Sequence, residues 1–125
     1  MVVLVCGDRN WDDYDTIRRE LKKLPKGSVI IHGGCRGADK IAGEVAMELG
    51  FKVIAFPAEW DKYGKLAEHI RNAKMLEEIR PDVVLTFHDD LEHSKGTKDI
   101  AYRAAREQVM VKVISRSRLV KNDGI

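Results

Sequence analysis

The feature that most constrains the fold is a regular alternation of short apolar runs with longer amphipathic stretches. Five runs have the length and β-branched character of buried strands, and they span residues 2–6, 28–31, 51–56, 82–87 and 109–115. Four stretches repeat apolar residues at helical spacing, and they span about 13–24, 37–49, 65–79 and 97–108. This pattern predicts a Rossmann-like α/β fold, a doubly wound three-layer sandwich of about five parallel strands with four helices.

Capping signals set the expected boundaries of these elements. Asn10 or Asp12 can cap the first helix, and Pro25 with Gly27 ends it. The segment 57–64, between the third strand and the third helix, is expected to be a loop.

Composition indicates one globular domain. The chain has 125 residues, of which 44% are hydrophobic and 34% charged, enough for one core and a solvated surface. We expect a single domain over 1–115 and a C-terminal tail over 116–125. No apolar run approaches the ~20 residues of a membrane span, and the first run lacks the basic flank of a signal peptide. These features predict a cytoplasmic protein without a membrane partner.

Charge and cysteine content narrow the function classes further. The net charge of +2 is too small to indicate a nucleic acid or an anionic membrane. Cys6 and Cys35 lack CxxC spacing and are predicted to be free thiols rather than a disulfide pair. No metal site or cofactor is expected, because the histidines lack metal-ligand spacing with carboxylates; they are His32, His69, His88 and His93.

The expected sheet also predicts where a ligand binds. In parallel sheets of this kind, ligands bind beyond the carboxyl ends of the strands, where the strand order reverses. This places four segments on one rim, which are 7–9, 33–39, 57–64 and 88–97.

The segment from Gly33 to Asp39 is the strongest local signal on this rim. It leaves a strand and enters a helix, and Gly33, Gly34 and Gly37 allow a tight turn and close approach of an anion. The amides of the helix N-terminus favour phosphate, and Arg36 could add a charged contact. The alternative is a tight turn in which the glycines serve geometry alone, and the motif by itself does not decide between the two.

A second turn, Ser94-Lys95-Gly96-Thr97, also opens a helix after a strand. Its amides, the Thr97 hydroxyl and the Lys95 ammonium could bind a second anion. The alternative is an ordinary N-cap by Ser94 or Thr97. Two such turns on one rim favour a ligand.

Other residues join the candidate site with their own alternatives. Arg71, Asn72 and Met75 share one face of the third helix. Trp60 could stack on a base or plug the edge of the core. Arg9 could bind a phosphate or form a salt bridge with a nearby Asp.

Five motifs occur in order: Gly7-Asp8-Arg9-Asn10-Trp11, His32-Gly33-Gly34-Cys35-Arg36-Gly37-Ala38-Asp39, Phe56-Pro57-Ala58-Glu59-Trp60, Arg71-Asn72-Ala73-Lys74-Met75 and Gly96-Thr97. Through them the chain resembles the YspA-like branch of the SLOG superfamily over roughly residues 2–115. This superfamily includes the Lonely Guy enzymes and the DNA-processing protein of natural transformation. The resemblance implies a Rossmann-like fold and a pocket for nucleotides or nucleotide-derived ligands, in small bacterial or phage proteins.

The similar Lonely Guy enzymes cleave the N-glycosidic bond of nucleoside 5′-monophosphates. Arg71 and Met75 match their Arg-x-x-x-Met element. Their Gly-Gly-x-Gly-Thr loop is altered to His93-Ser94-Lys95-Gly96-Thr97, and the position of their catalytic Glu is Ile100, with Asp99 as the nearest acid. An apolar Ile cannot stabilise an oxocarbenium-like centre, so the resemblance supports phosphate binding rather than hydrolysis.

Three functions remain as hypotheses, in this order. The first is a module that binds a phosphate-bearing nucleotide-type small molecule through Gly7, Arg9, Gly33, Gly34, Arg36, Gly37, Asp39, Trp60, Arg71, Asn72, Lys95, Gly96 and Thr97. The second is a nucleotide N-glycosidase with Arg71 as the clamp and Asp99 or Glu59 as the acid. The third is single-stranded nucleic-acid binding, which the low net charge argues against. Homo-oligomers are also expected, with the third and fourth helices as candidate contacts.

Overall fold

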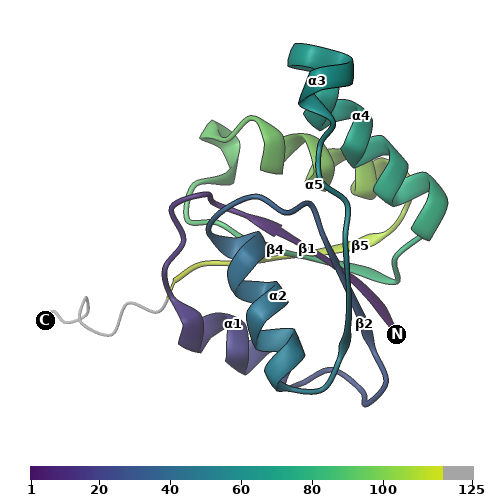
Figure 1. Cartoon of the computed structure of the whole chain (residues 1–125). Coiled ribbons are helices and arrows are strands. Elements are labelled where there is room, and N and C mark those ends of the chain that lie inside the picture. The colour runs from purple at the N-terminus through teal and green to yellow at the C-terminus, as the bar shows by residue number, and fades with distance from the viewer. Residues whose placement is uncertain (117–125) are drawn as a thin grey trace, which may run out of the picture.

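A computed structural model describes residues 1–116, and it shows a parallel sheet between two helical layers (Figure 1). The strands are β1 (Val2–Gly7), β2 (Val29–His32), β3 (Lys52–Ala55), β4 (Val83–Phe87) and β5 (Met110–Ile114). Their order in the sheet is β3-β2-β1-β4-β5, and every neighbouring pair is parallel. The predicted Rossmann-like α/β fold is therefore confirmed.

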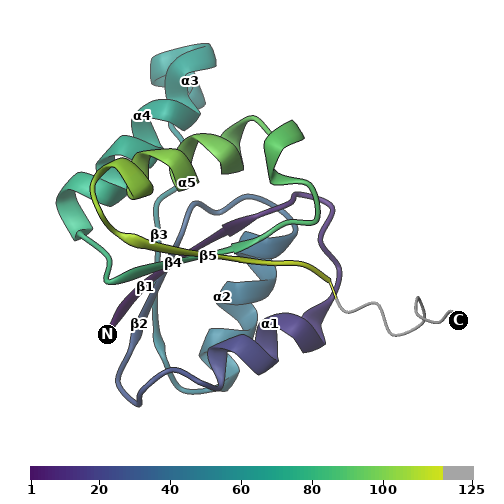
Figure 2. The ribbon, with the colours of Figure 1, turned by 180° about the vertical axis from the view of Figure 1, so that it is seen from behind.

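Two pairs of helices cover the two faces of the sheet (Figures 1 and 2). The helices α1 (Tyr14–Leu21) and α2 (Ala38–Glu48) lie on one face, and α4 (Ala67–Lys74) and α5 (Gly96–Arg106) lie on the other. Successive side chains of a strand point to opposite faces. Accordingly Val3 and Val5 pack in the core under α1 and α2, whereas Leu4 and Cys6 pack in the core under α4 and α5.

The first helix is shorter than the pattern predicts. Its N-cap is Asp13, whose Oδ1 accepts a hydrogen bond from the Thr16 amide at 3.0 Å, so the expected cap at Asn10 or Asp12 is wrong. The helix ends at Leu21 rather than at residue 24.

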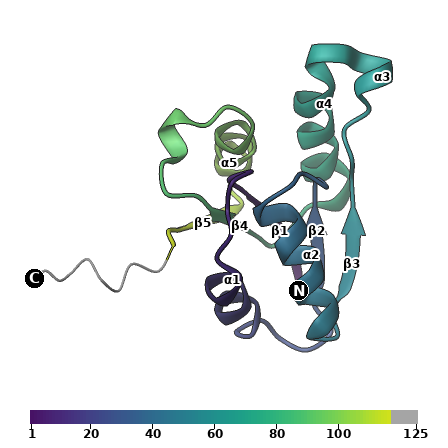
Figure 3. The ribbon, with the colours of Figure 1, turned by 60° about the vertical axis from the view of Figure 1, so that its left-hand side comes forward.

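The segment between β3 and β4 differs most from expectation. A short helix, α3 (Trp60–Tyr63), forms within the predicted loop and projects beyond the end of α4 (Figure 3). The predicted continuous helix over 65–79 is instead a 3₁₀ turn, η1 (Gly64–Leu66), then α4, then a π-helical turn, η2 (Met75–Ile79). Gly64 has a φ of 56°, which interrupts the helix between α3 and η1. Pro81 prevents continuation beyond η2.

Two further features complete the described chain. A 3₁₀ turn, η3 (Leu91–His93), lies in the predicted polar loop before α5. Among residues 1–116, no helix has the length and apolar character needed to cross a lipid bilayer. The predicted tail, apart from Arg116, lies outside the described residues.

Candidate functional site

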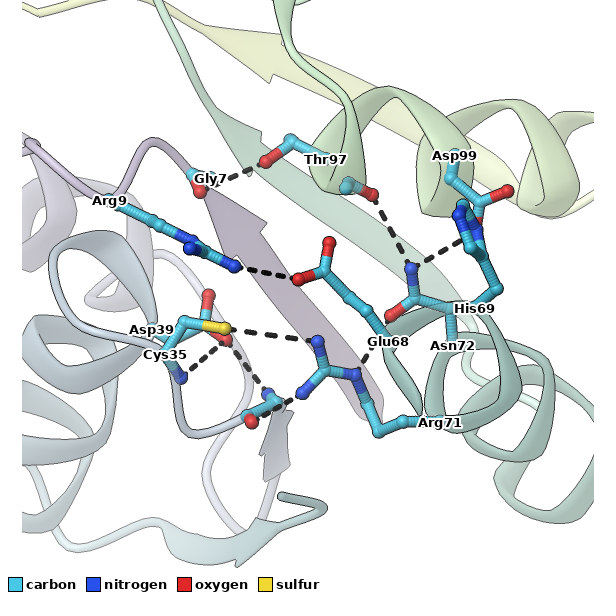
Figure 4. Close-up of polar contacts among 12 residues, drawn as sticks. Gly7, Arg9, Cys35, Asp39, Glu68, His69, Arg71, Asn72, Thr97 and Asp99 are labelled. Carbon is cyan, nitrogen blue, oxygen red and sulfur yellow. Dashed lines mark hydrogen bonds and ion pairs between the residues drawn. The ribbon is translucent and has the colours of Figure 1, made fainter. Parts of the chain in front are cut away.

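A cleft of about 490 Å³ lies at the carboxyl ends of the strands, where the sequence places the ligand. Both glycine turns contribute to this one cleft, and Figure 4 shows the side chains that meet there. The strand order reverses at β1, whose crossovers lead to β2 on one side and whose other neighbour is β4. The loop after β1 leads to α1 and the loop after β4 leads to α5 in the opposite layer, so the two loops diverge and leave a crevice between them.

In the first glycine turn, two backbone amides donate hydrogen bonds to a side chain of the protein itself. Asp39, in the first turn of α2, accepts hydrogen bonds through its Oδ2 from the Gly33 amide at 3.0 Å and the Cys35 amide at 3.3 Å. The Asp39 side chain thus takes the place at these two amides that the sequence interpretation gave to a phosphate. Only 5% of Asp39 is exposed.

Burial also changes the acidity of Asp39. It raises the pKa of the carboxyl group from 3.8 to about 6, although the Cys35 amide, the Arg71 guanidinium and the Gly33 amide act in the opposite direction. The Asp39 carboxyl group therefore binds its proton more tightly than an ordinary aspartate does.

Arg71 reaches the same turn from α4 and is buried. Its Nη1 donates to the carbonyl oxygens of Gly33 at 2.5 Å and Phe56 at 3.2 Å, and its Nε donates to Asn72 Oδ1 at 2.9 Å. Its Nη2 lies 3.8 Å from Cys35 Sγ. Nη1 of this guanidinium thus joins α4 to the residues that follow β2 and β3, and Figure 4 shows Arg71 beside the first glycine turn.

The second glycine turn leaves its amides available. Ser94 Oγ accepts from the Lys98 amide at 2.9 Å, so the Ser94 side chain caps the helix from the residue before its N-cap, Lys95. The Thr97 hydroxyl donates to the Gly7 carbonyl at 3.0 Å and ties α5 to the end of β1. Within residues 1–116, the amides of Gly96 and Thr97 donate to no protein acceptor. The N-terminus of α5 therefore retains two amide donors at the cleft.

Glu68 and Arg9 form an ion pair inside the cleft. Arg9 Nη2 donates to Glu68 Oε2 at 2.7 Å, so Arg9 forms a salt bridge, which is one of its two alternatives, but with a Glu of α4 rather than an Asp. The other Glu68 oxygen lies against Gly96, where a side chain would overlap it. A carboxylate thus rests at the positive end of α5.

A cluster of polar side chains lies between α4 and α5, beside the cleft. Asn72 donates through its Nδ2 to Asp99 Oδ2 at 3.1 Å and to the Gly96 carbonyl at 3.4 Å. Asp99 also accepts from Arg103 at 2.9 Å and lies 3.3 Å from His69 Nδ1. Burial opposes ionisation of Asp99, but hydrogen bonds from Asn72, Arg103 and His69 hold its pKa below the usual value. Asp99 is therefore an ionised anchor for its neighbours.

Most of the sequence-predicted site residues meet in this cleft. Those that line it are Gly7, Arg9, Gly33, Arg36, Asp39, Trp60, Arg71, Asn72, Lys95, Gly96 and Thr97. Trp60 is 52% exposed, so it borders the cleft and does not plug the core.

Four predicted residues do not line the cleft. Gly34 and Gly37 shape the first turn, and Gly37 lies so close to the Asp8 and Arg9 carbonyls that a side chain would overlap them. Asp99 belongs to the polar cluster between α4 and α5, where it accepts a hydrogen bond from Asn72. Glu59 lines a separate cavity of about 270 Å³ between the end of β3 and α4.

The cleft is also lined by polar residues that the sequence does not predict as site residues, among them Lys65, Glu68 and His69. For Glu68 and His69, the available signal was their position on α4, just before Arg71. Cys6 and Cys35 are free thiols, as predicted, and burial raises the pKa of Cys6 to about 12. Among residues 1–116, no group of three or more His, Cys, Asp or Glu side chains is arranged to hold a metal ion.

The fold and this crevice define a Rossmann-like protein with its site at the switch in strand order, and comparison with known proteins gives the family. A family model for the YspA, cpYpsA-related SLOG family matches residues 1–63. The chain belongs to this family. It is also 36% identical to the Gene 61 protein of Mycobacterium phage D29, over 87% of this chain and 92% of the phage protein.

Proposed function

We propose that this protein binds a phosphate-bearing, nucleotide-type ligand in the cleft at the carboxyl ends of the strands. The observation that carries the proposal is a cleft of about 490 Å³ with two unpaired helix-terminal amides, those of Gly96 and Thr97. Ligand pockets in proteins typically have volumes of about 300–1,000 Å³, so one nucleotide-sized molecule fits this range.

The phosphate is assigned to α5 and not to the first glycine turn. The amides of Gly33 and Cys35 already donate to Asp39, and a phosphate beside that carboxylate would meet like charge. At α5, two amides have no acceptor among residues 1–116 and the helix dipole favours an anion, so a phosphate there competes with the Glu68 carboxylate but not for occupied amides. Lys95 and Arg36 line the same cleft and supply positive charge.

Binding is favoured over N-glycoside hydrolysis by the positions of the candidate acids. Glu59 lines the separate cavity, and Asp99 is held by Asn72, Arg103 and His69. Neither carboxylate lines the cleft in which the ligand would bind.

Titration calorimetry with AMP, GMP, CMP and UMP tests the proposal. We expect binding by the wild-type chain and affinity roughly 3- to 10-fold lower in Lys95→Ala, because an ammonium beside the phosphate is lost. Lys26→Ala is the matched control, since Lys26 is exposed at the opposite edge of the sheet, and it should bind as the wild type does. Absence of binding with all four nucleotides would refute the proposal. Chromatography of the same samples detects released base, which only the hydrolase hypothesis predicts.

A further inference from the structure

The order of the strands sets the order of chemical groups along the cleft. In the sheet order β3-β2-β1-β4, Trp60 follows β3, Asp39 follows β2, Gly7 ends β1, and Gly96 with Thr97 follows β4. All five line the cleft. Neighbouring strands lie about 4.8 Å apart, so the carboxyl ends of these four strands form a line of roughly 14 Å, and the segments that carry the groups leave the strands in that order. The line runs from an aromatic ring, past a carboxylate, to an anion-attracting helix end.

Asp39 has a second oxygen that the protein does not use. Its Oδ2 accepts both turn amides, whereas within residues 1–116 no donor is hydrogen-bonded to its Oδ1. The residue is 5% exposed and lines the cleft. A buried carboxylate oxygen without a donor is costly, and most buried polar atoms in folded proteins have a partner. Oδ1 can therefore accept a hydrogen bond from a ligand bound in the cleft.

We propose that Asp39 Oδ1 accepts a hydrogen bond from a ribose hydroxyl, so that the cleft selects ribonucleotides over deoxyribonucleotides. This inference rests on the proposed function, with the phosphate at α5. The nucleotide then lies across the strand ends with its base at Trp60 and its sugar between base and phosphate, beside Asp39.

A sugar hydroxyl fits this position better than the other groups of a nucleotide. A phosphate would meet the negative charge of Asp39, and it has the free amides of Gly96 and Thr97 at the other end of the line. The base has a ring surface to stack on at Trp60, at the outer end. Asp39 lines the same cleft, so a sugar bound there can approach its free oxygen.

The first test uses the wild-type chain alone. Calorimetry compares AMP with 2′-deoxy-AMP and 3′-deoxy-AMP at one pH and salt concentration. We expect at least one of the deoxy compounds to bind roughly 10- to 100-fold more weakly, because a hydrogen bond to a charged acceptor is lost. Equal affinity for all three compounds would overturn the inference and leave the proposed function intact. If none of the compounds binds, nor GMP, CMP or UMP, the proposed function fails as well.

The second test assigns the discrimination to Asp39. In Asp39→Asn, the amide oxygen can still accept from Gly33 and Cys35, but the other position becomes an NH₂ donor. We expect the AMP to deoxy-AMP ratio to fall to within about threefold of one. Asp61→Asn, an exposed change of the same type on α3, should keep the wild-type ratio. A ratio that is unchanged in Asp39→Asn, or a variant that alters the preference among bases instead, would show that Asp39 does not read the sugar.

Discussion

At the scale of single residues, two carboxylates reach the cleft from opposite layers. Asp39 comes from α2 and accepts the turn amides, and Glu68 comes from α4 and pairs with Arg9. Each carboxylate lies where the sequence pattern alone would place an anionic ligand. A pattern of glycines before a helix predicts anion-attracting amides, but it does not reveal which anion satisfies them. That depends on side-chain positions set by packing between layers.

The position of Glu68 gives a prediction about affinity. Glu68→Gln removes the negative charge that rests against Gly96 and releases the guanidinium of Arg9. We expect AMP to bind roughly 2- to 10-fold more tightly, because the helix end loses a competing anion. Glu77→Gln makes the same charge change at an exposed site on η2 and should have no effect. Weaker binding in Glu68→Gln would place the phosphate elsewhere.

The raised pKa of Asp39 gives a prediction about stability. Its folded-state pKa of about 6 exceeds the reference value of 3.8, so the folded state binds the proton more tightly than the unfolded chain does. The contribution of Asp39 to stability is therefore greatest at low pH and falls as pH rises through the range 4 to 6. Asp39→Asn lacks this titration. Between pH 7 and pH 4, we expect the wild type to gain roughly 2 kcal/mol relative to the variant in urea unfolding. A stability difference that does not vary with pH would contradict the assignment.

At the scale of elements, α2 is set against the end of β1 by a close backbone approach. Gly37 has φ 79° and ψ −128°, and its Cα faces the carbonyl groups of Asp8 and Arg9. The Ala38 amide donates to the Asp8 carbonyl at 3.1 Å. These contacts fix the N-terminus of α2, and with it the position of Asp39.

This approach predicts unequal costs for two similar substitutions. Gly27 also has a positive φ, of 82°, but its surroundings are open. We expect Gly27→Ala to cost about 1 kcal/mol through backbone strain alone. Gly37→Ala should cost at least about 3 kcal/mol, since it adds an overlap with backbone atoms. Urea unfolding of both variants measures the difference, and similar losses would show that the close approach is unimportant.

The predictability of the elements follows from the strength of their patterns. The strands β1, β2 and β4 and the helix α2 agree with the sequence prediction because most of their residues are buried, whereas the outer strands β3 and β5 are recognised by their β-branched residues. The segment 60–79 differs from the prediction, because α3 has no buried residue and Gly64 breaks the pattern beside it. The π-helical turn η2 buries Met75 and Leu76 much as an α-helix would, so apolar spacing does not reveal it.

At the scale of the whole molecule, the topology predicts the position of the cleft. Alternating strands and helices imply a parallel sheet, and such sheets bind ligands at one edge. The cleft accordingly collects eleven of the thirteen predicted binding residues; only Gly34 and Gly37 lie outside its lining. The roles of Arg71 and Asp39 could not be foreseen in this way, because they depend on contacts between layers that are distant in sequence.

The whole-molecule prediction concerns amide hydrogen exchange. A nucleotide across the strand ends would contact turns of both layers, so we expect slower exchange at 33–37, 59–65 and 95–98 when AMP is present. The turns at 22–28 and 49–51 lie at the amino-terminal ends of the strands, and their amides should exchange at the same rate with and without AMP. Mass spectrometry of peptic fragments measures both sets. Protection confined to the turns at 22–28 and 49–51 would contradict the assigned cleft.

The hydrogen bonds of Arg71 also bear on how fast a ligand can be captured. This guanidinium joins α4 to the carbonyl groups of Gly33 and Phe56, at the ends of two strands. Because these hydrogen bonds hold α4 and the strand ends together, the cleft needs no rearrangement before a ligand binds. Little conformational freedom is therefore lost on association. Differences between good and poor ligands should then appear in residence times rather than in association rates.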